Sequence, residues 1–130
     1  GVAMGGCRVG RRGVLSASGA ACAVKSLSAA AYGAKQEANM LSLVQGHSNI
    51  VKLQASFQTV TGVHLVMELC SGGDLSDHLK SDALPDALAA SFNGQLLSAL
   101  DFVHSHDLVH CDVKPSTHDC PNFRAGTGGY

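Results

Sequence analysis

The sequence has no excess of charge of either sign and no long apolar run. Nine Lys and Arg residues stand against ten Asp and Glu, which gives a formal net charge of −1. Binding to nucleic acid or to an anionic membrane calls for a basic surface, so we expect neither partner. No apolar run approaches the roughly 20 residues of a transmembrane helix, so we expect no membrane span.

The cysteines show no pairing pattern. Their number, five, is odd, and no C-x-x-C pair occurs. This usage is typical of reduced thiols inside the cell rather than of a disulfide framework. The first residues are glycine-rich and interrupted by arginines, unlike a secretory leader. We therefore expect a soluble, cytoplasmic protein, and its oligomeric state stays open. Because residue 1 is not Met, the natural start is expected upstream.

The length of 130 residues and the apolar content of 45% allow one domain with a core. Residues 1–20 are predicted as loops with a weak hairpin, and residues 21–27 as a short apolar strand. Apolar positions at helical spacing predict a helix over 34–45, which a following glycine ends. Two β-branched or aromatic stretches, 49–57 and 63–69, predict an antiparallel hairpin.

The second half contains a break, a long helix and a polar loop. Ser71-Gly72-Gly73 predicts a hinge over 70–74, followed by a short helix over 74–80. Pro85 begins a longer helix in which apolar residues repeat every four positions. The stripe consists of Leu88, Phe92, Leu96 and Leu100, with Leu97 and Val103 beside it. Residues 104–121 are predicted as a loop. The fold class is α+β.

The strongest motif is His110-Cys111-Asp112-Val113-Lys114-Pro115, directly after the long helix. It resembles the catalytic loop of protein kinases of the serine/threonine type, in which Lys stands two residues after the Asp. The resemblance implies that Asp112 is the base that accepts the substrate hydroxyl proton and that Lys114 contacts the γ-phosphate. The alternative is a surface loop with a solvated Asp and Lys.

Three further motifs follow the order of the same family. Ala23-Val24-Lys25 resembles the strand whose lysine holds the α- and β-phosphates of ATP, with Ala23 small enough for adenine to lie against it. The phrase from Gln45 to Val51 resembles the turn after the helix called αC in kinases. Glu37 lies ten residues before His47, the family's distance for the glutamate that pairs with the lysine.

The segment from Val66 to Leu75 resembles the kinase hinge that receives adenine. By this resemblance Glu68 and Cys70 supply backbone groups to the purine, Met67 controls the back pocket and Asp74 reaches the ribose. The nearest groups are the calcium/calmodulin-dependent and calcium-dependent kinases, although no calcium-binding loop is visible.

The resemblance implies a two-lobed kinase fold. A small antiparallel-sheet lobe with helix αC is expected over residues 1–70, and the hinge with the first helices of the large lobe over 71–130. ATP and Mg²⁺ are the implied cofactors, and a protein is the implied substrate. The implied activity is transfer of the γ-phosphate to Ser or Thr in a complete protein.

The sequence departs from the family pattern at three places. Gly10 and Gly13 carry the second and third spacings of the glycine-rich phosphate loop, but Arg8 stands in place of the first glycine. Cys111 stands in place of the arginine that pairs with an activation-loop phosphate, and a buried thiol is expected there. Thr117 stands in place of the magnesium-binding asparagine.

Pro121-Asn122-Phe123 matches the family's phrase around that asparagine, so we expect an insertion over 117–121 and Asn122 as the displaced magnesium ligand. The chain ends before any Asp-Phe-Gly segment, so we expect these 130 residues alone to be inactive. A pseudokinase or truncated binding module remains an alternative. A metal-binding module remains another, built on His104, His106, His110, Cys111, His118 and Cys120.

Overall fold

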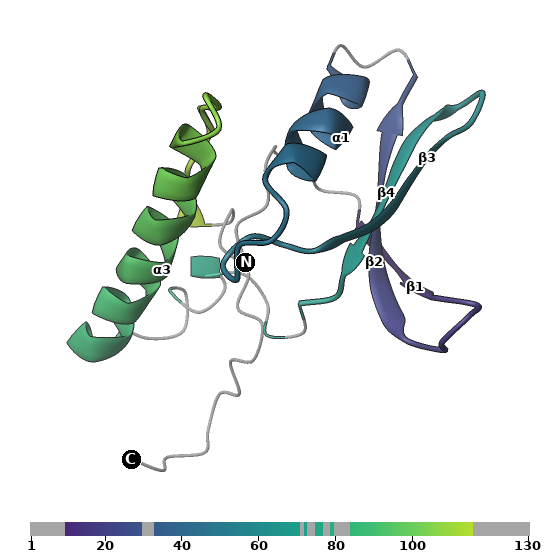
Figure 1. The fold of residues 1–130 in the computed structure, drawn as a ribbon. Helices are drawn as coiled ribbons and strands as arrows, with labels where there is room; N and C mark the ends of the chain where they lie inside the picture. Colours follow the sequence, from purple (N-terminus) through teal and green to yellow (C-terminus); the bar gives the residue numbers. More distant parts are fainter. Residues whose placement is uncertain are drawn as a thin grey trace.

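The computed structural model describes residues 10–29, 33–70, 72, 75–76, 79 and 84–115. Within these ranges, four strands and two long helices follow one another in the order β1, β2, α1, β3, β4, α3 (Figure 1). The strands form one antiparallel sheet in the order β1-β2-β4-β3. The predicted α+β class is confirmed.

Strands β1 (Gly10–Val14) and β2 (Ala21–Ser28) form the first hairpin. In the turn between them, the N–H of Leu15 donates to the carbonyl of Ala20 at 2.9 Å, and Gly19 has a φ of 69° that glycine adopts without cost. The structure confirms the predicted strand over 21–27. Where the sequence indicated only a weak hairpin before it, the structure has strand β1 paired with β2.

Strands β3 (Leu53–Gln58) and β4 (Gly62–Glu68) form the second hairpin. The prediction began the first of these strands at Asn49, four residues too early. Ile50 and Val51 are β-branched, but they are buried in the core ahead of the strand, which begins at Leu53. The N–H of Leu53 donates to the side-chain carbonyl of Gln45 at 2.8 Å, so side-chain bonds replace ladder bonds where the strand begins.

Helix α1 (Ala34–Leu43) buries Ala34, Ala38 and Leu41 against the sheet. It ends two residues before the predicted end at Gln45. Gly46 has a φ of 101°, which only glycine adopts readily, so the chain leaves the helical path there as the sequence predicts.

Helix α3 (Asp86–His104) begins directly after Pro85, as predicted. Its buried face differs from the predicted stripe: Phe92, Ala99 and Val103 are buried, whereas Leu97 is 66% exposed. A repeat of four residues advances by more than one 3.6-residue turn, so the stripe drifts around the helix. The buried residues of α3 are therefore Phe92, Ala99 and Val103, spaced seven and then four residues apart.

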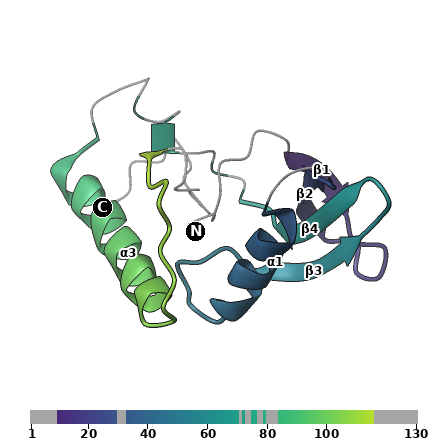
Figure 2. The same cartoon turned by 90° about the horizontal axis from the view of Figure 1, so that it is seen from above.

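One core joins the sheet, both helices and the segment between α1 and β3. Its buried members are Ala34, Ala38, Leu41, Val44, Ile50, Val51, Val63, Leu65, Ala99 and Val103. Seen from above, α1 lies between the sheet and α3 (Figure 2). The predicted helix over 74–80 falls mostly outside the described residues, although Leu75, Ser76 and Leu79 are helical.

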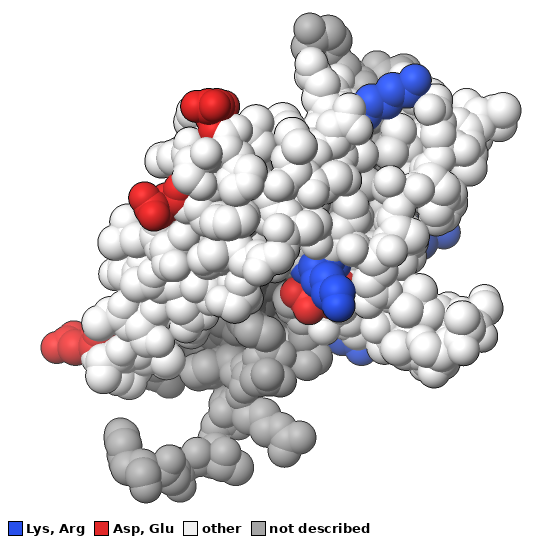
Figure 3. Space-filling model, viewed as in Figure 1, with Lys and Arg blue, Asp and Glu red and all other residues white. Residues whose placement is uncertain are grey.

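The described surface carries few charges. On the face shown in Figure 3, acidic side chains lie over α3 and also beside a basic side chain near the centre of the view, and the other basic side chains lie apart from one another. Among the described helices, none has both the length and the apolar character required to cross a bilayer.

Candidate functional site: a buried lysine–glutamate pair and a polar loop

Lys25 is a buried cation in the middle of the sheet. It lies on β2, with Gly10 and Leu65 as its cross-strand partners, and only 5% of its surface is exposed. Its ammonium forms an ion pair with the carboxylate of Glu37, on α1 (residues 34–43). Lysine is rarely buried without such a partner, because an unpaired charge in the interior costs several kcal/mol. The structure thus brings together the two residues that the family resemblance paired.

The same face of the sheet carries Ala23 and Met67. These two residues are cross-strand partners on β2 and β4, and partners in an antiparallel ladder share a face. Ala23 lies two residues before Lys25, and alternate residues of a strand also share a face. Ala23, Lys25 and Met67 therefore form one surface, on the side of the sheet that meets α1.

Gly10 and Gly13 occupy a different place from the one predicted. Both lie inside strand β1, where Gly10 pairs with Lys25 and Gly13 pairs with Cys22. A Cβ on Gly13 would lie 3.2 Å from the sulfur of Cys22, so glycine there makes room for a neighbouring strand. The expected open loop does not include these two glycines. Gly5 and Gly6 precede β1 in the sequence, outside the described residues.

The end of β4 is held by a reciprocal contact between Glu68 and Lys52. The N–H of Glu68 donates to the carbonyl of Lys52 at 2.9 Å, and the N–H of Lys52 donates to the Glu68 carboxylate at 3.0 Å. Cys70 is half-buried two residues further on. Asp74, the predicted ribose contact, lies outside the described residues.

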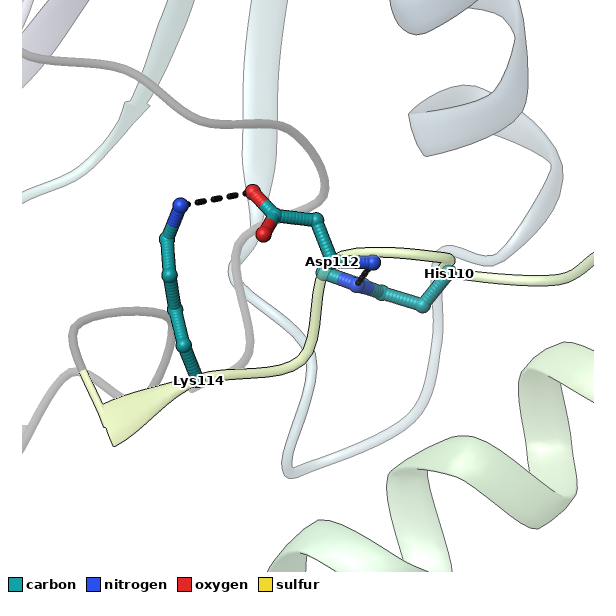
Figure 4. Close-up of polar contacts among 3 residues, drawn as sticks. All are labelled: His110, Asp112 and Lys114. Carbon is teal, nitrogen blue, oxygen red and sulfur yellow. Dashed lines mark hydrogen bonds and ion pairs between the residues drawn. The ribbon is translucent and has the colours of Figure 1, made fainter.

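The polar loop after α3 places Asp112 and Lys114 side by side. Figure 4 shows the two side chains pointing toward each other, with the ammonium of Lys114 2.7 Å from Oδ2 of Asp112. Both side chains are about half exposed, at 50% and 46%. A ligand can therefore reach both the carboxylate and the ammonium.

His110 and Cys111 shape this loop. His110 is buried, and its carbonyl accepts a bond from the N–H of Asp112 at 2.9 Å. Such a bond across two residues closes a three-residue turn, whose central residue Cys111 has a φ of 59°. The side chain of Cys111 is exposed, which corrects the expectation of a buried thiol. The tight turn holds it out of the core.

The loop lies on the inner side of α3. In both views the segment after α3, coloured yellow-green, runs back along the side of that helix that faces α1 (Figures 1 and 2). Asn122, the predicted magnesium ligand, lies outside the described residues. Within the described ranges, no three His, Cys, Asp or Glu residues gather in a group suited to a metal ion. His104, His106, His110 and Cys111 therefore form no such group, and His118 and Cys120 lie outside those ranges.

The family model for the protein kinase domain matches residues 5–117, most of the chain. The chain belongs to the protein kinase family. The match includes Lys25, Glu37, Asp112 and Lys114 and ends at Thr117, so Asn122 lies beyond it.

Similar kinases agree in type. Over 82 residues the chain is 40% identical to death-associated protein kinase dapk-1 of Caenorhabditis elegans, covering 62% of this chain and 6% of that protein. Over 73 residues it is 41% identical to the calcium and calcium/calmodulin-dependent serine/threonine-protein kinase DMI-3 of Medicago truncatula, covering 55% and 14%. The resemblance to these kinase groups is confirmed. Because these relatives are named as kinases, they do not favour the pseudokinase alternative.

A solved kinase structure agrees with the fold. The crystal structure of Rad53 1-466 in complex with AMP-PNP superposes with a TM-score of 0.73 at 27% identity, covering 82% of this chain and 29% of that one. The predicted kinase-like fold is confirmed. The chain spans only 6% to 17% of the length of the curated relatives named dapk-1, CBL-interacting serine/threonine-protein kinase 10 and DMI-3.

Two residues that hold the site's framework carry no sequence signal of their own. Gln45 makes three hydrogen bonds to backbone groups, and His47 contacts α3. From the sequence, Gln45 is predicted to end a helix, and Gln45 and His47 belong to a phrase typical of the family, but neither is predicted to make these contacts. Their partners are backbone atoms and a serine distant in sequence, so only the folded chain reveals them.

Proposed function

We propose that this chain binds MgATP and supplies the proton-accepting group of a serine/threonine protein kinase. The observation that carries the proposal is the buried ion pair between Lys25 on β2 and Glu37 on α1. A buried cation that is held by a carboxylate from another element is suited to binding an anionic ligand. The packing of an ordinary sheet does not require such a buried ion pair.

The nucleotide fits the face that carries Lys25. Its ammonium is suited to the α- and β-phosphates, and the small side chain of Ala23, on the same strand, leaves room for a flat ring beside Met67. The N–H of Glu68 already bonds to Lys52, so a purine would use the Glu68 carbonyl and the backbone of Cys70. Rad53, a structural relative, is known in complex with AMP-PNP, which supports ATP as the ligand.

The loop after α3 fits the transfer step. Phosphoryl transfer demands positioning and charge stabilisation more than covalent chemistry from the protein. The Asp112 carboxylate is exposed enough to accept the proton of a Ser or Thr hydroxyl, and Lys114 beside it offsets negative charge at the γ-phosphate. A protein segment presenting such a hydroxyl is the substrate in this proposal.

Magnesium would be held mainly by the phosphates of the nucleotide. Among the described residues, Asp112 offers a carboxylate of the hard type that Mg²⁺ prefers, but no cluster of three such ligands forms. We propose Asn122 as a further ligand from its sequence context alone. When bound, the metal supplies charge neutralisation at the phosphates.

The phosphate-covering glycines are reassigned in this proposal. A backbone N–H that is bonded within a strand ladder is not available to cradle a phosphate. Gly10 and Gly13 lie in the β1–β2 ladder. We therefore propose that the covering segment precedes Gly10, where the sequence carries Gly5 and Gly6.

The proposal is tested by substituting Lys25 and measuring nucleotide affinity. Lys25→Met keeps the length of the side chain and removes its charge, so affinity for AMP-PNP with Mg²⁺ should fall roughly ten- to a hundredfold, the value of one charge-assisted hydrogen bond. Isothermal titration calorimetry measures the change. Lys35→Met, at an exposed lysine on α1, is the matched control and should bind like the unsubstituted protein. Equal affinity in both variants would refute the assignment of Lys25.

A further inference from the structure

Strand β3 (Leu53–Gln58) has an open edge. It is the last strand in the sheet order β1-β2-β4-β3, and among the described residues no other strand pairs with its outer side. Figure 2 shows it at the margin of the sheet. An edge of this kind presents a row of unpaired backbone N–H and C=O groups, which another strand can bind.

The protection that is common at sheet edges is missing from most of β3. The strand contains neither a charged residue nor a proline. It has an irregularity between Leu53 and Ala55, but its pairing with β4 is regular over residues 55–58. Ser56 pairs with the buried Leu65 and so lies on the side of the sheet that meets α1, yet it is exposed. Helix α1 therefore does not cover this edge.

The bonds of the β3–β4 hairpin show which backbone groups point outward. The N–H of Thr59 donates to the carbonyl of Gly62 at 2.8 Å, and the N–H of Gly62 donates to that of Thr59 at 3.3 Å. In an antiparallel ladder, such hydrogen-bonded pairs alternate with pairs that are not hydrogen-bonded. Phe57 therefore bonds to β4, whereas Ser56 and Gln58 direct their N–H and C=O groups away from it.

Phe57 adds an apolar contact surface beside these groups. Its side chain is 48% exposed and stacks on the ring of His64, with centroids 5.1 Å apart. The ring of His64 is held at both nitrogens, by the hydroxyl of Ser26 at 2.9 Å and that of Thr59 at 3.0 Å. An exposed aromatic ring that is already held in one orientation loses little conformational entropy when it is covered. Ala55, two residues before Phe57, lies on the same face of the strand.

We propose that β3 pairs in antiparallel register with β3 of a second copy of this chain, with Ser56 at the centre. In this register Ser56 meets Ser56 of the second copy, and the two exchange the backbone bonds that both direct outward. The neighbouring position on the opposite face brings Phe57 against Ala55 of the second copy, a large side chain against a small one. No like charges meet, because the strand has no charged residue. The edge is thus complementary to itself, which favours a second copy over an unrelated partner.

The dimer should be weak and reversible. One pair of edge strands buries less than the roughly 1,200–2,000 Å² of a stable interface, so we expect a dissociation constant on the order of 0.1 mM. The proposal does not depend on the proposed function, because none of the residues assigned to the nucleotide or to the transfer step lies on β3.

The test exchanges charge at Ser56 and measures self-association of the full chain by sedimentation velocity, from about 10 μM to about 1 mM. Ser56→Lys places two ammonium groups opposite each other across the pair, and Ser56→Glu places two carboxylates there. Each variant alone should dimerise roughly two- to fivefold more weakly. An equimolar mixture of the two should associate at least as tightly as the unsubstituted chain, because opposite charges then meet.

Ser91→Lys and Ser91→Glu are the matched controls, since Ser91 is exposed on α3, away from β3. Both should dimerise like the unsubstituted chain. Ser56→Pro removes an N–H that β4 does not use, so the fold should persist while the dimer is lost over the whole range. A chain that stays monomeric throughout would overturn the proposal. Dimers that the charge variants at Ser56 leave unchanged, or a mixture as weak as each variant alone, would do the same.

Discussion

Cys111 shows how a single residue can be identified correctly by type and wrongly by environment. The sequence places it in the catalytic loop, in the position where the family has arginine, and a thiol there is expected to be buried. The structure gives it a φ of 59° and an exposed side chain. The tight turn that bonds Asp112 to His110 determines this conformation. Such a turn has no residue pattern that predicts it.

The backbone at Cys111 predicts opposite effects for two substitutions. A left-handed conformation costs a residue with a Cβ roughly 1–2 kcal/mol, so Cys111→Gly should leave the free energy of unfolding unchanged or raise it by up to about 1 kcal/mol. Cys111→Val adds a branched Cβ, which this region tolerates least, and should lower it by about 1–2 kcal/mol. Urea unfolding measures both. A glycine variant less stable than the valine variant would contradict the turn geometry.

The charged residues of the site were the easiest to predict. Lys25 belongs to an Ala-Val-Lys motif and Glu37 stands at the family's distance from His47, and the structure brings the two into an ion pair across β2 and α1. Gly10 and Gly13 matched a spacing equally well, yet they lie in a paired strand. Glycine is used for many purposes, including close strand packing, whereas a buried lysine needs a carboxylate. Spacing is therefore more informative for Lys25 than for Gly13.

At the scale of elements, strands and helices were predicted better than their faces and limits. The sequence pattern predicted correctly that α3 begins at Pro85. It also placed Leu97 beside the apolar stripe, but the side chain of Leu97 is mostly exposed in the structure. Amphipathic spacing shows which side of a helix is apolar, but the residues that become buried depend on the surface the helix packs against. In α3 that surface is the core, which contacts Ala99 and Val103. Strand β3 likewise starts late because Gln45 takes the first backbone bond.

The β3–β4 hairpin depends on one glycine. A Cβ at Gly62, the first residue of β4, would lie 1.9 Å from the carbonyl oxygen of Leu27 on the neighbouring strand β2. That distance is far inside van der Waals contact, and the contacting atom belongs to the backbone, so the strands must separate. Gly62→Ala should therefore lower the free energy of unfolding by about 1–3 kcal/mol or more.

Gly94 is the matched control for this prediction. It lies within α3, and a Cβ there would meet nothing within 4 Å. Gly94→Ala should raise the free energy of unfolding by about 0.5–1 kcal/mol, because alanine loses less backbone entropy in a helix. Chemical denaturation of both variants gives the comparison. Similar changes in the two would show that the close approach at Gly62 is absent from the folded protein.

At the scale of the molecule, the family gives the arrangement that composition could not. Composition and periodicity indicated an α+β domain with a break near residue 70, and the division into lobes at 70/71 stays a prediction. The kinase motifs were needed to relate Lys25 on the sheet to Asp112 after α3, because 87 residues (112 − 25) separate them in the chain. Their roles rest on the family. The contacts of Gln45 and His47 between them rest on the structure.

Because different residues are proposed to bind the nucleotide and to accept the substrate proton, we predict that one substitution can abolish phosphate transfer and leave nucleotide binding intact. Lys25 and Glu37 are proposed to hold the nucleotide, and Asp112 to accept the proton of the substrate hydroxyl. In a complete kinase domain, because these 130 residues alone are expected to be inactive, Asp112→Asn should therefore lower phosphate transfer to a protein substrate by about 10²–10⁴-fold. Affinity for AMP-PNP should stay the same, because the amide keeps the shape of the side chain. Transfer of radiolabelled γ-phosphate and calorimetry measure the two quantities on one preparation.

Asp107→Asn provides the control for that experiment. Asp107 is also exposed and follows α3, and its φ of 58° is one that asparagine tolerates well. The control makes the same chemical change a few residues from the proposed base and should leave both transfer and affinity unaltered. An Asp112→Asn protein that still transfers phosphate at the control's rate would remove this carboxylate from the mechanism, while the Lys25–Glu37 pair would keep its role in binding the nucleotide.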